Sequence, residues 1–415
     1  MTRTLRAQLG AVDAVVAGLG ATIGAGLFAG LAPASSLAGR WLLVAMVVAA
    51  IAAWCCCCST CDQSGAFPGS GGGYRYTREL LGRWPGRMAG GLYLASRAAA
   101  AAALSGCFGA YVAPDRPVLP ALAVLVLAVA ADTAGVRLPR AVTRALTVFV
   151  LVVLGLVVAA CFAIPAPPPT GVPIAAGTPG LDNPGELLPA AGVLFFAFLG
   201  FEQVTAPGAD QPVASARRLR WAVPVLLAVS LATYLAVSAA VLRQLGPTRL
   251  AISATPLRDA LDAADAGALD PLVTVAVMVA TGIALLLVVG GGRRIADVMA
   301  TVGDLPAGRP RPAPGAAVRM LVGAGAALCV LFVGPAHSIG LAATCALFYY
   351  AFTNASARLL SKSERSWPAR TACFGLGFSV LIGMTMPPAD LLIALGVSGV
   401  ALVAGPLVSR LPARR

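Results

Sequence analysis

Charged side chains are scarce in this sequence, and their scarcity excludes an ordinary soluble domain. Of the 415 residues, 11% are charged and 59% are hydrophobic, whereas soluble domains carry roughly 25% charged residues. The mean hydropathy is +0.86. A chain of this composition is predicted to be an all-α protein that crosses a lipid bilayer many times.

Histidine and the common catalytic motifs are also nearly absent. His337 is the single histidine, and no GxxxxGK(S/T), HExxH or GxSxG motif occurs. The ten cysteines show no repeated CxxC spacing. The consecutive residues Cys55–Cys58 point in different directions on a helix, so they cannot share one metal ion. We predict no enzymatic activity, no catalytic residue, no metal site and no cofactor, and we assign His337 no role.

The apolar residues gather into twelve runs of about the length that a membrane-spanning helix needs, which is roughly 20 residues. The runs cover residues 10–32, 40–61, 86–113, 118–134, 140–164, 187–209, 220–243, 270–292, 316–333, 336–359, 369–386 and 388–410. We therefore predict twelve transmembrane helices in a lipid bilayer.

Basic residues exceed acidic ones, and membrane topology explains the excess. The net charge of +13 is also typical of nucleic-acid-binding proteins, but these basic residues lie in short connections. With the N-terminus inside, 24 of the 30 Lys and Arg residues fall on the cytoplasmic side, five fall outside and Arg97 lies within a span. We expect no nucleic-acid partner, and a multi-pass protein of the plasma (inner) membrane with both termini in the cytoplasm.

The first apolar run is unusually rich in glycine, with Gly18, Gly20, Gly24, Gly26 and Gly30 in one stretch. Glycine disfavours helix by up to roughly 1 kcal/mol relative to alanine. An interrupted membrane helix indicates a binding site, but GxxxG pairs are equally typical of close helix packing. Both interpretations remain open from this run alone.

The sixth run contains a second interruption, Gly200-Phe201-Glu202, with Pro207 five residues beyond the glutamate. An ionisable residue at membrane depth is a functional hypothesis by default; the alternative is that Glu202 is solvated or paired with a loop arginine. Interruptions at corresponding positions of two halves are typical of an inverted-repeat transporter. Free N–H groups of a broken helix 1 would then hold a carboxylate, and free carbonyls of a broken helix 6 an ammonium group.

This pattern predicts a 5+5 inverted repeat with broken helices 1 and 6, followed by two C-terminal helices. The first five-helix repeat is expected in residues 1–165, the second in residues 187–360, and helices 11 and 12 in residues 361–415. A proline-rich stretch without Lys or Arg, residues 165–186, separates the two repeats.

Four motifs in this order resemble the amino acid–polyamine–organocation permeases, which have the leucine-transporter-type fold. They are Gly20-Ala-Thr-Ile-Gly-Ala-Gly-Leu-Phe28, Gly71-Gly-Gly-Tyr74, Phe195-Phe-Ala-Phe-Leu-Gly-Phe-Glu202, and Gly291-Gly-Arg-Arg-Ile-Ala-Asp297 through Gly303-Asp-Leu-Pro306. The resemblance implies substrate contacts at Thr22, Ile23, Gly24, Ala25, Gly26, Phe198, Gly200 and Phe201. It also implies an aromatic gate near Phe198 or Phe201.

The sequence departs from the pattern that some members of this family show at the coupling-ion site. Span 5, from Ala141 to Ile164, has no lysine that would take the place of a sodium ion. Span 8 offers Thr274 and Thr281, which are too far apart to act as the paired hydroxyls of sodium-coupled relatives. The resemblance therefore favours proton coupling or exchange over sodium coupling.

Arg97 lies near the middle of span 3, where an arginine must face protein or water. It is expected to form a structural or gating ion pair with Glu202, because buried charges need partners. Two alternatives are a fixed charge in place of a bound cation and a contact to an acidic substrate group.

The sequence as a whole predicts a secondary active transporter of amino acids or related amines that works by alternating access. Arg97 and Glu202 are its candidate coupling or gating residues. The alternative is a channel or a transport-inactive scaffold that keeps the permease fold. The sequence does not indicate an oligomeric state.

Overall fold

The computed structural model describes residues 11–67, 69–136, 138–165, 183–205, 216–305 and 316–410, and every regular element in these ranges is a helix. The longer elements are α1 (Ala11–Ala38), α2 (Leu42–Ala66), α3 (Gly72–Leu81), α4 (Arg83–Val112), α5 (Val118–Thr133), α6 (Arg140–Ala163), α7 (Leu187–Phe198), α8 (Glu202–Thr205), α9 (Ala216–Ile252), α10 (Pro256–Ala263), α11 (Asp270–Thr301), α12 (Ala316–Leu328), α13 (Pro335–Ala357), α14 (Ala369–Met384) and α15 (Pro388–Arg410). Short turns of helix are η1 (Gly39–Trp41), η2 (Pro184–Glu186), η3 (Gly267–Leu269) and η4 (Cys329–Val333).

Helix occupies each of the twelve apolar runs. The sixth run is broken as predicted, because α7 ends at Phe198 and α8 begins at Glu202. The eleventh and twelfth runs, α14 and α15, meet at an angle of 119° on either side of Pro387. Most of the proline-rich connection expected between the two repeats, residues 166–182, lies outside the described residues.

The prediction of a broken helix 1 is wrong. α1 runs without interruption from Ala11 to Ala38, and none of the glycines between positions 18 and 30 has a positive φ. These glycines serve close packing instead. A Cβ on Gly26 would overlap the backbone of Ala197 on α7, and a Cβ on Gly24 would overlap the carbonyl oxygen of Ala280 on α11. Their lack of a side chain brings helices together rather than breaking one.

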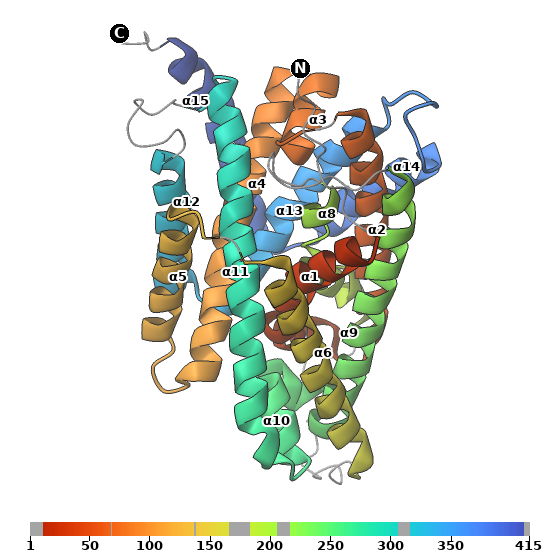
Figure 1. The fold of residues 1–415 in the computed structure, drawn as a ribbon, viewed down its shortest axis with the longest axis vertical. Coiled ribbons are helices and arrows are strands. Elements are labelled where there is room, and N and C mark those ends of the chain that lie inside the picture. Colours follow the sequence, from red (N-terminus) through yellow and green to blue (C-terminus); the bar gives the residue numbers. More distant parts are fainter. Residues whose placement is uncertain are drawn as a thin grey trace.

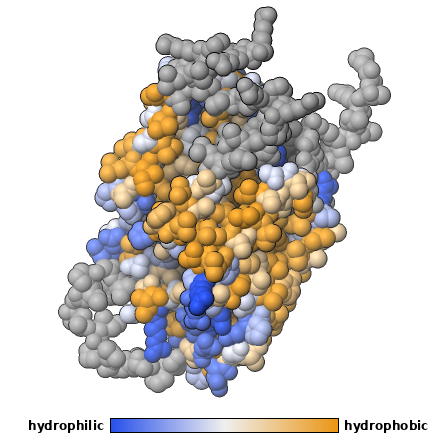
Figure 2. All heavy atoms as spheres, turned by 90° about the vertical axis from the view of Figure 1, so that its left-hand side faces the viewer, coloured by the Kyte–Doolittle hydropathy of each residue, from blue (hydrophilic) through white to orange (hydrophobic). Residues whose placement is uncertain are grey.

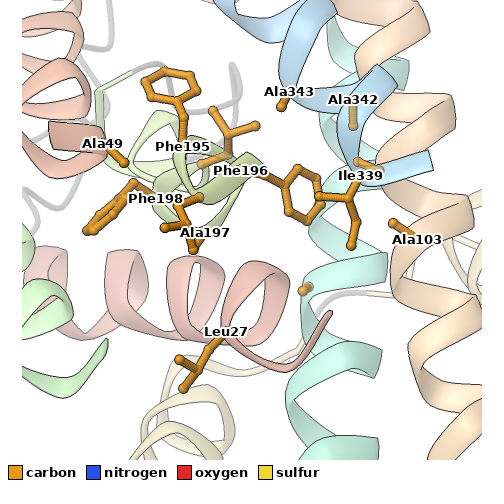
Figure 3. Close-up of a cluster of buried hydrophobic side chains, with 14 of the residues drawn as sticks. Leu27, Ala49, Ala103, Phe195, Phe196, Ala197, Phe198, Ile339, Ala342 and Ala343 are labelled. Carbon is orange, nitrogen blue, oxygen red and sulfur yellow. The ribbon is translucent and has the colours of Figure 1, made fainter. Parts of the chain in front are cut away.

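The short helix α7 lies at the centre of the bundle, beside α1, α2 and α13. Figure 3 shows the phenylalanines of α7 surrounded by small side chains, including Ala49 of α2 and Ala342 and Ala343 of α13. α1 passes below α7 and runs across α11 rather than alongside it (Figures 1 and 3). Large aromatic rings facing alanines fill the interior, so the polar groups around the α7–α8 break are held in a dry environment.

The outer surface of the bundle is apolar. Figure 2 shows a broad hydrophobic band on the face that carries α5 and α12, with hydrophilic side chains gathered toward its lower edge. On α5, Leu119 and Leu127 are 68% and 67% exposed, and Phe332 of η4 is 81% exposed. Apolar patches of this extent on a monomer mark contact with another surface or with lipid.

Four helical stretches among the described residues are long and apolar enough to cross a membrane alone, and the bent α14–α15 pair would add a fifth. The interior helices α4 and α13 are not among them. These two helices are rich in alanine, glycine, serine and tyrosine, which lowers their mean hydropathy. They pack against each other, and α4 also contacts α11 while α13 contacts α14. Figure 1 places α3 at one end of the bundle and α10 at the other.

The packing of α1 can be tested with a matched pair of glycine variants. Gly26→Ala is expected to destabilise the protein, because overpacking costs about 1–3 kcal/mol and the neighbouring atoms are backbone. Gly30→Ala is the control, since no atom lies within 4 Å of its Cβ position. It should be neutral or slightly stabilising. The measurement is the apparent melting temperature of the detergent-purified protein, and equal behaviour of the two variants would contradict close packing at Gly26.

Candidate functional site

The break between α7 and α8 depends on Gly200. Leu199 leaves the helix in an extended conformation, and Gly200 has φ +136°, which side-chain-bearing residues rarely adopt. A Cβ at this position would also lie 2.8 Å from the backbone of Ala21 and Thr22 on α1. Gly200 therefore lets the chain turn while it touches the backbone of the first helix.

The substrate residues expected on α1 and at the break come close together, but they do not surround an open cavity. Thr22 is buried and its hydroxyl donates to the Gly18 carbonyl at 2.7 Å. A cavity of about 20 Å³ lies against Ala21, Gly200 and Arg97, which is room for about one water molecule. In this conformation the region is closed.

The expectation that free N–H groups on helix 1 hold a carboxylate is wrong for this conformation. Because α1 is continuous, the N–H groups of residues 23–26 are committed to helical hydrogen bonds. One expected free carbonyl at the break is also taken. The Tyr234 hydroxyl of α9 lies within hydrogen-bonding distance of the carbonyl oxygens of Thr22, at 2.7 Å, and Ala197, at 2.8 Å, and its single proton serves the two acceptors. A neutral hydroxyl thus bridges α1 to the end of α7.

The two phenylalanines of the predicted gate are fully buried and each faces a tyrosine. The rings of Phe198 and Tyr234 are 5.2 Å apart in an edge-to-face arrangement, and those of Phe201 and Tyr350 are 5.4 Å apart. Such pairs contribute about 0.5–1.5 kcal/mol beyond their burial. The two phenylalanines lie on the two sides of Gly200 in the sequence, Phe198 at the end of α7 and Phe201 just before α8.

The structure brings Arg97 and Glu202 together, as the sequence led us to expect. Arg97 Nη1 of α4 lies 3.6 Å from Glu202 Oε2 of α8, and the two residues are 5% and 7% exposed. Tyr93 donates to Oε2 at 3.0 Å, and Tyr350 of α13 donates to Oε1. The carboxylate therefore has a cation and two hydroxyl donors, which compensate for its removal from water.

Arg97 is less completely satisfied than Glu202. Its guanidinium lies over the ring of Tyr93, 4.8 Å from the ring centre, which is a favourable position for a cation. Its Nε has no hydrogen-bond partner among the described residues. The pair is thus asymmetric, with a fully bonded carboxylate and a guanidinium that keeps one unused donor.

Glu202 lies between two water-sized cavities. One of about 20 Å³ touches Tyr93, Thr205 and Arg294, and the other, of about 20 Å³, is the cavity beside Arg97 and Gly200. Among the residues that line either space, Glu202 is the one common to both. Each of these spaces has room for about one water molecule beside the Glu202 carboxyl.

A second buried carboxylate, Asp304, closes the end of the bundle that carries α3. It pairs with Arg87 of α4 at 2.8 Å and Arg78 of α3 at 3.2 Å, and Tyr74 donates to it at 2.7 Å. Burial, together with the Asp304 carboxylate, raises the pKa of Tyr74 above its ordinary value, so its hydroxyl remains a donor. The cluster ties α3, α4 and the end of α11 together.

Sequence reasoning missed the four tyrosines that complete these clusters, Tyr74, Tyr93, Tyr234 and Tyr350. The chain has seven tyrosines, and tyrosine in membrane proteins is commonly found at the bilayer interface. A tyrosine inside an apolar run was the available signal, because a buried phenol needs a partner for its hydroxyl. Each of them has a partner more than 100 residues away in the sequence, and the nearer partner of Tyr234, Ala197, is still 37 residues away, so no local pattern indicates these contacts.

Comparison with known proteins places these features in context. The protein-family model described as amino acid permease matches residues 9–405 of this chain. A protein of Mycobacterium bovis and one of Mycobacterium tuberculosis, each named an uncharacterized transporter, are each 36% identical over 405 residues, which cover 96% of this chain and 91% of the relative.

The Arg97–Glu202 pair can be tested by a double-mutant cycle. Arg97→Met leaves a buried carboxylate without its cation, and breaking such a pair costs about 3–5 kcal/mol. Adding Glu202→Gln removes the stranded charge and should recover part of the lost melting temperature.

The matched control for this cycle is Arg258→Met, which breaks the Arg258–Asp270 pair, 3.9 Å apart, whose side chains are 30% and 20% exposed. Its loss should be smaller, because exposed ion pairs contribute about 0–1 kcal/mol. Purely additive losses in the Arg97–Glu202 cycle would show that the two side chains do not depend on each other.

Proposed function

Because the chain belongs to the amino acid permease family, we propose that it is a secondary transporter that carries amino acids or related amines across the plasma membrane by alternating access. The family and the apolar helices make it a multi-pass membrane protein whose cargo is a small molecule. The transporter names of its relatives agree with a transport role rather than an enzymatic one.

The observation that carries this proposal is the broken helix with an ionisable pair at the break. Irregular backbone at membrane depth is tolerated where protein covers it or where it lines a cavity. Buried ionisable residues in membrane helices commonly mark substrate or proton pathways. Gly200, Arg97 and Glu202 bring both features to one place.

For the architecture we propose twelve spanning helices in a 5+5 inverted repeat. The first repeat takes residues 1–165 and the second residues 187–360, with α14 and α15 as the two additional helices in residues 361–415. Both termini lie in the cytoplasm in this arrangement, which follows the concentration of basic residues on one side. The end that carries α3 then faces the cytoplasm and the end that carries α10 faces outward. The first helices of the two repeats differ in this structure. The first helix of repeat 1, α1, is continuous, whereas the first helix of repeat 2 is divided into α7 and α8.

We propose that the substrate binds between α1 and the α7–α8 break once α1 moves away from Ala197 and Ala280. The residues concerned are Thr22, Ile23, Gly24, Ala25, Gly26, Phe198, Gly200 and Phe201. The Tyr234 hydroxyl now donates toward the Thr22 and Ala197 carbonyls, which are acceptors that a substrate ammonium group would use. In this proposal the Tyr234 hydroxyl occupies the position of the substrate ammonium group while the site is closed.

For coupling we propose that Glu202 carries the proton and that Arg97 sets its charge balance. Protonation of Glu202 would leave the Arg97 charge uncompensated, so a proton on the carboxyl changes the electrostatics of the break. The two water-sized cavities that Glu202 lines have room for water molecules that would carry a proton to its carboxyl. Exchange of one substrate for another is the alternative form of coupling.

Uptake into proteoliposomes tests the proposal directly. The purified protein is given a mixture of labelled amino acids, with and without an imposed proton gradient that is acidic outside. Saturable uptake that the gradient stimulates is expected. Unsaturable flux would indicate a channel, and a lack of both uptake and counterflow would indicate a transport-inactive scaffold.

The role of Glu202 is tested by Glu202→Gln in the same assay. The variant is expected to lose stimulation by the proton gradient and to keep substrate counterflow, because the amide preserves shape but does not titrate. Glu79→Gln is the control, since it makes the same chemical change at an exposed position of α3. Gradient stimulation that persists in Glu202→Gln would remove Glu202 from the coupling step.

A further inference from the structure

A large cavity lies at the end of the bundle that carries α10, away from the residues proposed to bind substrate. Its volume is about 720 Å³, within the range of roughly 300–1,000 Å³ that is usual for ligand pockets. The second half of α1, the start of α7, the start of α13 and the α14–α15 turn surround it. Phe28 and Val193 line the cavity, while Gly26 and Phe198, closer to the break on the same helices, do not.

The carboxyl groups around this cavity are not balanced by lysine or arginine. Its lining contains the carboxyl groups of Glu186 and Asp390 and the imidazole of His337, and no lysine or arginine is among the lining residues. The other lining residues are mostly alanine, proline and larger apolar side chains, with a few hydroxyls. A cavity of this kind suits a ligand with an apolar body and a positive charge.

Asp390 is the distinctive group in this lining. It is 8% exposed, and no hydrogen bond or salt bridge to its carboxylate is found among the described residues. The imidazole of His337, which lines the same cavity, interacts with this carboxylate electrostatically. Gly340 of α13 provides the space that Asp390 occupies, because a Cβ there would lie 2.8 Å from Asp390 Oδ2. The Asp390 oxygens are not among the fully buried side-chain atoms that lack a hydrogen-bond partner. They therefore reach the surface of the cavity that Asp390 lines, where a cation that enters the cavity can pair with them.

The simpler explanation is that Asp390 stabilises the first turn of α15, where an acidic side chain interacts favourably with the helix dipole. That interaction does not require burial and is available to a carboxylate in water. It explains neither the contact with Gly340 on another helix nor the absence of lysine and arginine from the cavity lining.

We propose that this cavity is a binding site for organic cations, specifically amines with an apolar body, and that Asp390 is the counter-ion for the ammonium group. This inference rests on the proposed function for one point, which is that the cavity lies on the outer side of the substrate path. It deepens the proposed function by naming cationic amines as the class of ligand that binds in this cavity first. The C-terminal pair α14–α15 thereby contributes a recognition residue through its turn.

Equilibrium binding to the full-length protein in detergent tests this proposal without requiring transport. The probes are tryptamine, which is cationic, tryptophol, which is neutral, and indole-3-propionate, which is anionic; all three carry the same indole. Tryptamine is expected to bind at least about tenfold more tightly than the other two, because a charge-assisted hydrogen bond to a desolvated carboxylate exceeds a neutral one. Equal affinity for the three probes would overturn the proposal.

Variants of the recognition residue locate the binding. Asp390→Asn is expected to weaken tryptamine binding about tenfold and to leave tryptophol binding unchanged. Gly340→Ala should weaken tryptamine binding without changing any charge, because its Cβ displaces the carboxylate. Asp115→Asn, an exposed acidic position that does not line the cavity, is the control and should have no effect.

The melting temperature of each variant separates recognition from a structural role. If Asp390→Asn lowers the melting temperature but leaves the preference for tryptamine intact, Asp390 only stabilises α15 and the proposal is wrong. Amine binding without any uptake or counterflow would contradict the proposed transport function while leaving this site standing. If the protein takes up amino acids but shows no preference for tryptamine, the proposed transport function stands and the proposed amine site is wrong.

Discussion

The close approach of three helix backbones is the constraint on which the interior of this protein depends. Gly26 meets the backbone of Ala197 on α7, Gly24 meets the Ala280 carbonyl on α11, and Gly200 meets α1 in return. No Cβ fits at any of these contacts. Small residues at membrane-helix interfaces give close packing in place of a hydrophobic driving force. These contacts also fill the space between α1 and the α7–α8 break, where the substrate is proposed to bind, so the packing of α1 accounts for the closed conformation.

The same approach determines where charge is held in the interior. Because Gly200 turns the chain beside α1, α8 starts with Glu202 facing α4 and α13, and the carboxylate meets Arg97, Tyr93 and Tyr350 there. A carboxylate in such a dry interior is tolerated because three donors surround it. The Nε of Arg97 has no hydrogen-bond partner among the described residues, so the guanidinium is less completely satisfied than the carboxylate.

The sequence predicted the location of the helices well, because long apolar runs leave little ambiguity once soluble folds are excluded. It also predicted that Arg97 and Glu202 would meet, since each is an isolated charge in an apolar run and needs a partner. The sequence could not show whether the glycines of α1 interrupt that helix or allow neighbouring helices to pack closely against it. Glycine is favoured in both situations, so its presence does not distinguish them. The hydrogen bonds of Tyr93, Tyr234 and Tyr350 could not be predicted from the sequence either, because they join residues that are distant in the chain.

The correction at α1 changes what movement the proposed transport cycle requires. If helix 1 were broken, its free N–H groups would already be available and the substrate would simply enter. With α1 continuous, a substrate carboxylate can reach those N–H groups only if helical hydrogen bonds near Gly24 are given up. The Tyr234 hydroxyl, which joins the Thr22 and Ala197 carbonyls, must leave in the same step. In the proposed cycle, substrate binding therefore requires the separation of α1 from α7, and alternating access needs such a link between binding and conformational change.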